Sequence, residues 1–214
     1  MWRATNITYP AVEKYLYGLV PRSDPVMREM ERYAARHDVP IVGPTVGRLF
    51  HLLAQITGAK RIFEMGSAIG YSTMWFAMGA GSGAEVHYAD GSADNARRAQ
   101  EYFLRARLAD RIHIHIGMAQ EKLAETLGEF DIIFIDVDKQ QYPETLRLAL
   151  PRVRSGGLLL ADNTLWSGRA ARKAKPRDVH TRGIQQFNRA VYASKELFPV
   201  MVPFRDGVTI CRKL

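Results

Sequence analysis

The chain has 214 residues, of which 47% are hydrophobic and 24% charged, as in an ordinary globular protein. No run of about 18 apolar residues is present, which predicts no membrane-spanning helix, and the single Cys211 excludes an internal disulfide and a cysteine metal cluster. The net charge of +8 favours nucleic acid or another polyanionic partner, although a basic enzyme without such a partner explains it equally well. The first residues lack the apolar core of a signal peptide, so we expect a cytoplasmic location.

Residues 10–57 have helical patterns and no obvious strand. Ser23 or Asp24 would cap a helix that begins at Pro25, with Val26–His37 as its body. A second helix is predicted over Val46–Ile56, where apolar residues recur at helical spacing. We expect residues 1–58 to form a helical cover, within one domain that spans residues 1–214.

From Lys60 onward, predicted strands and helices alternate. The expected strands are Arg61–Met65, Ala84–Ala89, Arg111–Ile116, Asp131–Ile135 and Gly157–Ala161. The expected helices are Tyr71–Met78, Ala93–Arg107, Ala119–Leu127, Tyr142–Leu150 and Gly183–Glu196. Two closing strands, Phe198–Pro203 and Val208–Cys211, flank a hairpin signal at Arg205–Asp206–Gly207. The pattern predicts an α/β fold over residues 59–214. We expect a doubly wound, Rossmann-like sheet of seven mostly parallel strands with an antiparallel C-terminal hairpin.

Charged side chains directly follow two of the predicted strands. Asp136, Asp138 and Lys139 follow the fourth strand, and Asp162 and Asn163 follow the fifth. In open α/β sheets, ligands bind outside the carboxyl ends of the strands, and oxygen donors there suit a hard divalent cation. The alternative is a set of helix caps and turn residues, which are common roles for Asp and Asn.

The segment 64–72 (EMGSAIGYS) links the first predicted strand to its helix. Its glycines allow the backbone to approach a ligand closely, and Asp90, at the end of the next strand, can accept ribose hydroxyls. The segment lacks the G-x-G-x-x-G pattern of dinucleotide-binding turns. Glu64 would repel phosphate and attract a cation, so the stretch favours S-adenosylmethionine (SAM), which carries an adenosine and a positive charge. A plain strand–helix turn is the alternative.

His113 and His115 lie two residues apart and would share one face of a strand, as a pair of metal ligands does. No third ligand lies nearby in the sequence, so we expect no metal site there.

These stretches together resemble the metal-dependent O-methyltransferases of the catechol and caffeoyl-CoA type, from about residue 10 to the C-terminus. The motifs that carry the resemblance are Glu64–Ser72, Asp90, Phe130–Lys139 (FDIIFIDVDK), Asp162–Trp166 (DNTLW), Phe187–Asn188 and Arg205–Thr209 (RDGVT). The resemblance implies a SAM-dependent enzyme, commonly a homodimer.

The resemblance also assigns roles to individual residues. Asp136, Asp162 and Asn163 would hold Mg²⁺, Mn²⁺ or Ca²⁺, and Lys139 would be the general base. A lysine desolvated beside that metal would have a lowered pKa. The cofactor residues that the resemblance implies are Val42, Glu64, Gly66, Ser67, Ser72, Asp90, Ala119, Gln120 and Asp136. Trp166 and Arg169 are candidates for the acceptor site, with core packing as the alternative for Trp166.

Two kinds of acceptor remain open. One is a catechol-like small molecule or a catechol-bearing CoA thioester. The other is 5-hydroxyuridine in tRNA, whose O4 and O5 form a similar chelate. The stretches 33–42, 68–72, 110–113 and 139–142 resemble the bacterial tRNA 5-hydroxyuridine methyltransferase branch.

The basic segment Arg169–Arg182 suits phosphate contacts, and a solvated lid is its other interpretation. Outside this chemistry, a non-catalytic cofactor- or RNA-binding protein and an NAD-dependent oxidoreductase are the alternatives.

Overall fold

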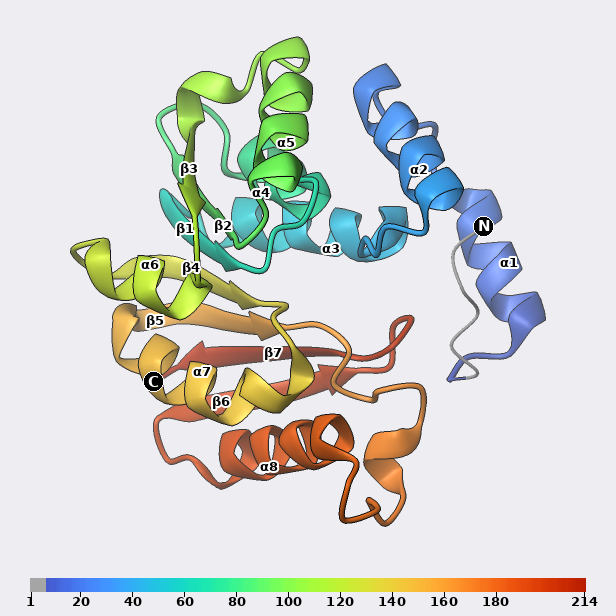
Figure 1. Cartoon of the computed structure of the whole chain (residues 1–214), viewed down its shortest axis with the longest axis vertical. Helices are drawn as coiled ribbons and strands as arrows, with labels where there is room; N and C mark the ends of the chain where they lie inside the picture. Colours follow the sequence, from blue (N-terminus) through green and yellow to red (C-terminus); the bar gives the residue numbers. More distant parts are fainter. Residues whose placement is uncertain (1–6) are drawn as a thin grey trace.

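The computed structural model describes residues 7–214, and within them seven strands form one sheet in the order β3-β2-β1-β4-β5-β7-β6 (Figure 1). The strands are β1 Arg61–Met65, β2 Glu85–Asp90, β3 Ile112–Ile116, β4 Phe130–Ile135, β5 Val153–Ala161, β6 Leu197–Val202 and β7 Val208–Lys213. The first five run parallel, and β7 is antiparallel to both β5 and β6. The predicted fold class is confirmed.

Helices cover both faces of this sheet. They are α1 Pro10–Leu19, α2 Pro25–His37, α3 Gly43–Ile56, α4 Tyr71–Ala80, α5 Ala93–Arg105, α6 Ala119–Glu125, α7 Tyr142–Ala149 and α8 Val179–Ala193. Ile62 of β1 packs into a core with α2, α3, α4 and α5, whereas its neighbours Phe63 and Met65 pack with α6, α7 and α8. Two covered faces explain why the central strands are apolar without interruption.

The chain runs outward from β1 through β2 to β3, then returns to β4 beside β1. Neighbouring connections therefore diverge at the carboxyl ends of β1 and β4. A crevice at such a switch point is where open α/β sheets bind ligands.

The two largest differences from the expected element boundaries lie at the starts of α8 and β5. Helix α8 begins at Val179, four residues before the predicted Gly183, because the Asp178 carboxylate accepts hydrogen bonds from the backbone N–H of Thr181 (3.0 Å) and from its hydroxyl (2.7 Å). Strand β5 begins at Val153, so the predicted turn at residues 155–157 lies inside the strand, where its pairing with β4 shifts register. A local cap and a bulge leave little trace in the apolar pattern.

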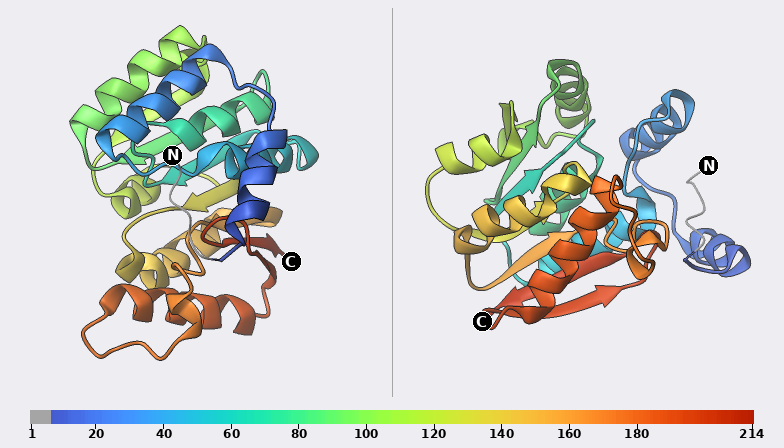
Figure 2. Two further views of the ribbon diagram at one scale, coloured as in Figure 1. Left: turned by 90° about the vertical axis from the view of Figure 1, so that its right-hand side faces the viewer. Right: turned by 60° about the horizontal axis from the view of Figure 1, so that its bottom comes forward.

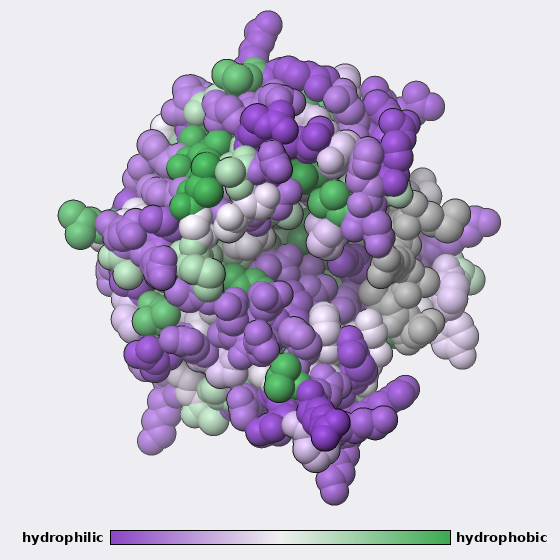
Figure 3. All heavy atoms as spheres, in the orientation of Figure 1, coloured by the Kyte–Doolittle hydropathy of each residue, from purple (hydrophilic) through white to green (hydrophobic). Residues whose placement is uncertain are grey.

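Helix α1 lies at one side of the molecule, away from the sheet (Figures 1 and 2), and none of its residues is buried. Hydrophilic side chains predominate on the face drawn in Figure 3, including its lower part over α8 and the segment before it. In residues 7–214, no helix has both the length and the apolar character that crossing a membrane requires.

Candidate functional site

A cavity of about 920 Å³ lies at the carboxyl ends of the parallel strands. The loops after β1 to β5 all contribute to its wall. The sequence-predicted site residues in that wall are Gly66, Asp90, Ala119, Gln120, Asp136, Lys139, Asp162, Asn163 and Trp166. The topology thus brings together residues that are up to a hundred positions apart in the chain.

Asp136 and Asp162 lie side by side because their strands do. Ile135 of β4 pairs with Ala161 of β5, and the two aspartates are the next residues of neighbouring parallel strands, which run about 4.8 Å apart. The Asp136 N–H donates to the Met65 carbonyl (2.8 Å) and the Asp162 N–H to the Ile135 carbonyl (3.3 Å). Backbone pairing therefore places both residues at the carboxyl end of the sheet.

Asp162 is almost fully buried, at 1% exposure. Burial raises its pKa to about 6, although the Arg205 guanidinium, 3.8 Å from Oδ2, acts in the opposite direction. Its other oxygen, Oδ1, has no hydrogen-bond partner among the described residues. A buried carboxylate oxygen without a partner is costly, and a bound cation would supply that partner.

The donor set fits a divalent cation. Residues 7–214 contain no group of three His, Cys, Asp or Glu side chains that could hold a metal. The third donor expected here is instead an amide, Asn163, which also lines the cavity and has a left-handed backbone (φ 56°). Two carboxylates and an amide oxygen are the hard ligands that Mg²⁺ and Ca²⁺ prefer.

Lys139 begins a short 3₁₀ helix, η2 Lys139–Gln141, and is buried. Its ammonium donates to Asp136 Oδ1 (2.6 Å), to the Tyr142 hydroxyl (3.0 Å) and to the Val137 carbonyl (3.2 Å). Burial lowers its pKa, but Asp136 and Tyr142 outweigh this, and the net pKa is raised. The carboxylate neighbour thus stabilises the charge of Lys139 in this structure, and the lowered pKa expected beside a bound metal stays a prediction.

Residues 66–70 connect β1 to α4 and are called the glycine turn below; this turn packs against the loop after β4. Gly66 has φ 91°, and a Cβ there would lie 2.3 Å from the carbonyl oxygen of Asp136, so only glycine fits. The N–H groups of Gly66 and Ser67 both donate to the Ala89 carbonyl (2.9 and 3.1 Å). The turn is thus held between β2 and β4, with its backbone at the cavity.

Four predicted cofactor residues are absent from the cavity wall that residues 7–214 form: Val42, Glu64, Ser67 and Ser72. Glu64 is fully buried behind the turn, where its carboxylate accepts hydrogen bonds from the hydroxyls of Ser72 and Thr73. Burial raises the pKa of Glu64 to about 7. Glu64, Ser67 and Ser72 thus lie on the core side of the turn and bond to one another. Val42 follows Ile41, which does line the cavity.

Asp90 is held in a fixed orientation at the end of β2. Its Oδ2 accepts from the Ala68 N–H (2.9 Å), and its Oδ1 accepts from the Ser92 N–H (2.9 Å) and the Asn95 amide (3.1 Å). Ala68 itself has φ 45°, a conformation that its place in the turn imposes. Asp90 faces the cavity with both oxygens already oriented.

Trp166 lines the cavity on the side of the segment after β5. Arg169 belongs to the short 3₁₀ helix η4 Arg169–Ala171, and its guanidinium lies 4.3 Å from the centre of the Trp166 ring. Arg169 does not line the cavity. The centres of the Trp166 and His180 rings are 6.2 Å apart. Sequence reasoning missed His180 and Arg205 as wall residues. Arg205 had a signal, since it begins the hairpin motif, and its guanidinium reaches the Ile41 carbonyl (3.1 Å).

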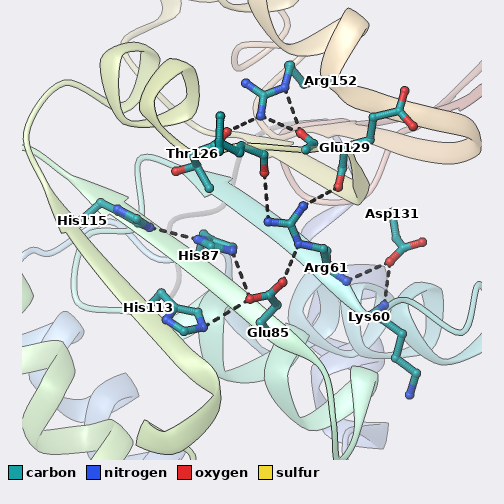
Figure 4. A network of polar contacts seen from close by, with 12 residues as sticks. Lys60, Arg61, Glu85, His87, His113, His115, Thr126, Glu129, Asp131 and Arg152 are labelled. Carbon is teal, nitrogen blue, oxygen red and sulfur yellow. Dashed lines mark hydrogen bonds and ion pairs between the residues drawn. The ribbon is translucent and has the colours of Figure 1, made fainter.

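At the opposite end of the sheet, the structure adds two neighbours to His113 and His115 (Figure 4). His87 Nδ1 lies 3.0 Å from His115 Nε2, and Glu85 Oε2 lies 3.4 Å from His113 Nε2 and 3.7 Å from His87 Nε2. Arg61 donates to the same Glu85 carboxylate (2.5 Å). The pairing of β2 with β3, which sequence spacing does not reveal, brings together His87, His113 and His115, called the histidine cluster below.

The histidine cluster predicts an acid-sensitive fold. Burial, together with His113 and His115, lowers the pKa of His87 to about 4. Its folded pKa lies below the unfolded value, so its contribution to stability is complete above about pH 6.5 and is lost as the pH falls toward about 4. We expect His87 to cost about 2 kcal/mol of unfolding free energy between about pH 7 and about pH 5.

Urea unfolding at both pH values would measure this loss. His87→Phe should flatten the pH dependence, whereas His37→Phe, at an exposed histidine, should leave it unchanged. Equal pH dependence in wild type and His87→Phe would show that His87 is not the cause.

Comparisons with known proteins agree with this geometry. A family model described as O-methyltransferase matches residues 20–214. The catechol O-methyltransferase of Niastella koreensis is 31% identical over 189 residues, which are 86% of this chain and 85% of that protein. Caffeoyl-CoA O-methyltransferase 1 of Eucalyptus globulus is 29% identical over 209 residues, 92% of this chain and 85% of its own.

A solved structure is similar over nearly the whole fold. The O-methyltransferase from Bacillus cereus in complex with SAH has a TM-score of 0.87 and 30% identity, covering 95% of this chain and 97% of its own. SAH is what remains of SAM once its methyl group is transferred.

Proposed function

The chain belongs to the O-methyltransferase family and is a SAM-dependent enzyme, and on this premise we propose that its acceptor is a hydroxyl of a metal-chelated pair of adjacent oxygens. Such a pair occurs in catechol-like small molecules and in catechol-bearing CoA thioesters. The names of the relatives from Niastella koreensis and Eucalyptus globulus support these two acceptor classes.

The observation that carries the proposal is the buried Asp162 oxygen without a hydrogen-bond partner, beside Asp136 and Asn163 in one cavity with Lys139. We propose that Asp136, Asp162 and Asn163 hold Mg²⁺ or a similar divalent cation. A cation held there would lower the pKa of a coordinated hydroxyl and compete with Lys139 for the Asp136 carboxylate.

Lys139 is the proposed proton acceptor. Because Asp136 and Tyr142 hold Lys139 as an ammonium, the lysine would first have to release a proton, which a cation that takes over Asp136 would favour by removing the contact that raises the lysine pKa. The neutral amine would then take the proton of the reacting hydroxyl at Nζ, where Val137 and Tyr142 offer acceptors for the resulting ammonium. The oxygen then attacks the methyl carbon of SAM in line, and the carbon–sulfur bond breaks to leave SAH. The remaining task of the chain is positioning, which can be worth roughly 7–11 kcal/mol.

We propose that the glycine turn, Asp90 and the Ala119–Gln120 pair position SAM. The turn presents backbone at the cavity, Asp90 has oriented oxygens for ribose hydroxyls, and Ala119 and Gln120 lie in the wall where the adenine is expected. Glu64, Ser67, Ser72 and Val42 act from behind this wall, through the turn.

A second candidate acceptor is 5-hydroxyuridine in tRNA, which the basic segment 169–182 favours. The segment contains Arg169, Arg172, Lys173, Lys175, Arg177 and Arg182 against the single acid Asp178. It begins beside the cavity, where Arg169 stacks on Trp166, and Gln185 fixes its backbone through the carbonyls of Ala170 (3.0 Å) and Arg172 (2.6 Å). Phosphates contacting this segment would place a nucleotide near the mouth of the cavity.

Transfer of labelled methyl from SAM in Mg²⁺ would decide between the acceptors. Catechol, caffeoyl-CoA and tRNA containing 5-hydroxyuridine would be compared side by side. Labelling of catechol or caffeoyl-CoA well above tRNA is the expected result. Labelling of tRNA alone would favour the second candidate, and labelling of none would contradict both.

A charge variant sharpens the comparison. Arg172, Lys173 and Lys175 would be changed together to Gln, with Arg147, Arg189 and Lys195, exposed elsewhere, as the matched control. A contact with tRNA or with CoA phosphates would make labelling of that acceptor fall steeply only in the first triple variant, and would make it depend on salt. Catechol labelling should be equal in both variants.

The homodimer implied by the resemblance stays a proposal. An apolar groove of about 830 Å³ between α1 and α3, and the exposed Tyr15, Leu19, Leu52 and Ile56 on these helices, support it. Sedimentation equilibrium would test it, since a mass near 24.2 kDa would contradict it.

A further inference from the structure

Tyr142, the first residue of α7, has its ring and its hydroxyl in different environments. The ring is fully buried in the core under α7 and α8 and packs edge-on against Phe187, at 5.2 Å between centroids and 76° between planes. The hydroxyl points out of this apolar core, back to the ends of β4 and β5. A buried hydroxyl in this place needs polar partners.

The hydroxyl has three close partners. It lies 2.9 Å from the Asp162 carbonyl oxygen, 3.0 Å from Lys139 Nζ and 3.3 Å from the Ile135 carbonyl oxygen. An ammonium has only donors, so the hydroxyl accepts from Lys139. Its single hydrogen then goes to a carbonyl, and Asp162 is the nearer. Tyr142 therefore connects Lys139 to the backbone of Asp162.

This connection differs from the other two bonds of Lys139. The acceptors on Asp136 and Val137 belong to the same loop as Lys139 and follow β4 directly. The bond to Tyr142 instead links the ammonium, through the tyrosine hydroxyl, to the Asp162 carbonyl at the end of β5, next to Asn163.

We propose that Tyr142 is a positioning residue, which fixes Lys139 Nζ relative to the Asp162–Asn163 end of the site. The inference rests on the proposed function, in which Lys139 takes a proton from an oxygen held at that end. The lysine side chain has four rotatable bonds, and the Tyr142 hydroxyl restricts them from the side of β5. A misplacement of about 1 Å can cost roughly 100-fold in rate.

Tyr142→Phe tests this role, because it keeps the ring and its packing and removes only the hydroxyl. We expect kcat for the best acceptor of the labelling comparison to fall by about 10- to 100-fold. The KM values for SAM and for the acceptor should stay within about 3-fold, because neither is expected to contact Tyr142. Phe187→Leu is the matched control: it disturbs the same packing, keeps the hydroxyl, and should leave kcat within about 3-fold.

A double variant separates positioning from a structural role. If Tyr142 acts through Lys139, then Tyr142→Phe should have almost no further effect on kcat in a Lys139→Met background. An unchanged kcat in Tyr142→Phe, or a loss of the same size in both backgrounds, would overturn the inference while leaving Lys139 as the base. Wild-type kcat in Lys139→Met, or no acceptor methylated at all, would overturn the proposed function and this inference with it.

Discussion

Replacement of Lys139 by Met is expected to lower kcat by about 10²–10⁴-fold, the usual range for the loss of a general base. Methionine retains an unbranched apolar side chain of similar length, so the buried channel that the lysine stem occupies stays filled. The proton of the acceptor hydroxyl then has no nearby amine to receive it. KM for SAM should change little, because Lys139 contacts Asp136, Val137 and Tyr142 rather than the glycine turn.

Initial rates with labelled SAM, at saturating acceptor and Mg²⁺, would measure this loss. Lys122→Met is the control, since Lys122 pairs with Glu125 on α6 and is not part of the cavity wall that residues 7–214 form. A Lys139→Met enzyme with more than about a tenth of wild-type kcat would show that another group, or water, takes the proton.

Asp162→Ala is expected to lower kcat by roughly 10³-fold, which corresponds to about 4 kcal/mol of transition-state stabilisation. The activity that remains should no longer depend on the metal. The variant loses the buried Oδ1 that has no other partner in the described chain. Since burial raises the pKa of this carboxyl, the folded state gains little from its charge, and the fold should tolerate the change. Loss of activity with an intact fold is therefore the expected outcome.

Asp110→Ala is the matched control, because Asp110 is an exposed carboxylate that does not line the cavity formed by residues 7–214. It should bind metal and turn over as the wild type does. Titration with Mn²⁺, followed by calorimetry, would measure metal binding independently of turnover. Equal Mn²⁺ affinity in Asp162→Ala and Asp110→Ala would remove Asp162 from the proposed metal site.

The sequence predicted the strand ends of this site well, for a geometric reason. Parallel strands end at one edge of a sheet, so Asp136 and Asp162, each following an apolar run, had to lie close together once the runs were recognised as neighbours. The glycines between β1 and α4 were expected to allow a close approach to a ligand. The structure shows at Gly66 a close approach to the Asp136 backbone, and the approach to a ligand stays a prediction.

The remaining features depend on contacts that periodicity does not encode. The raised pKa of Lys139 comes from the distance to Asp136, and the link from Tyr142 to Asp162 joins two strand ends through one hydroxyl. His87 joins the histidine cluster only through the register of β2 with β3. Glu64, which was expected at the cofactor, lies behind the cavity wall and bonds to Ser72, and its role toward the cofactor stays a prediction.

Metal dependence of methyl transfer is the most direct test of the proposed chemistry. The enzyme would be stripped with EDTA, exchanged into metal-free buffer, and assayed with labelled SAM and its best acceptor before and after addition of Mg²⁺. We expect labelling to fall by at least about 100-fold on stripping, to return with Mg²⁺, and to stay low in Asp162→Ala whatever the Mg²⁺ concentration. Full labelling by the stripped wild type would contradict a metal-chelated acceptor and would leave Lys139 to act on a hydroxyl that no cation activates.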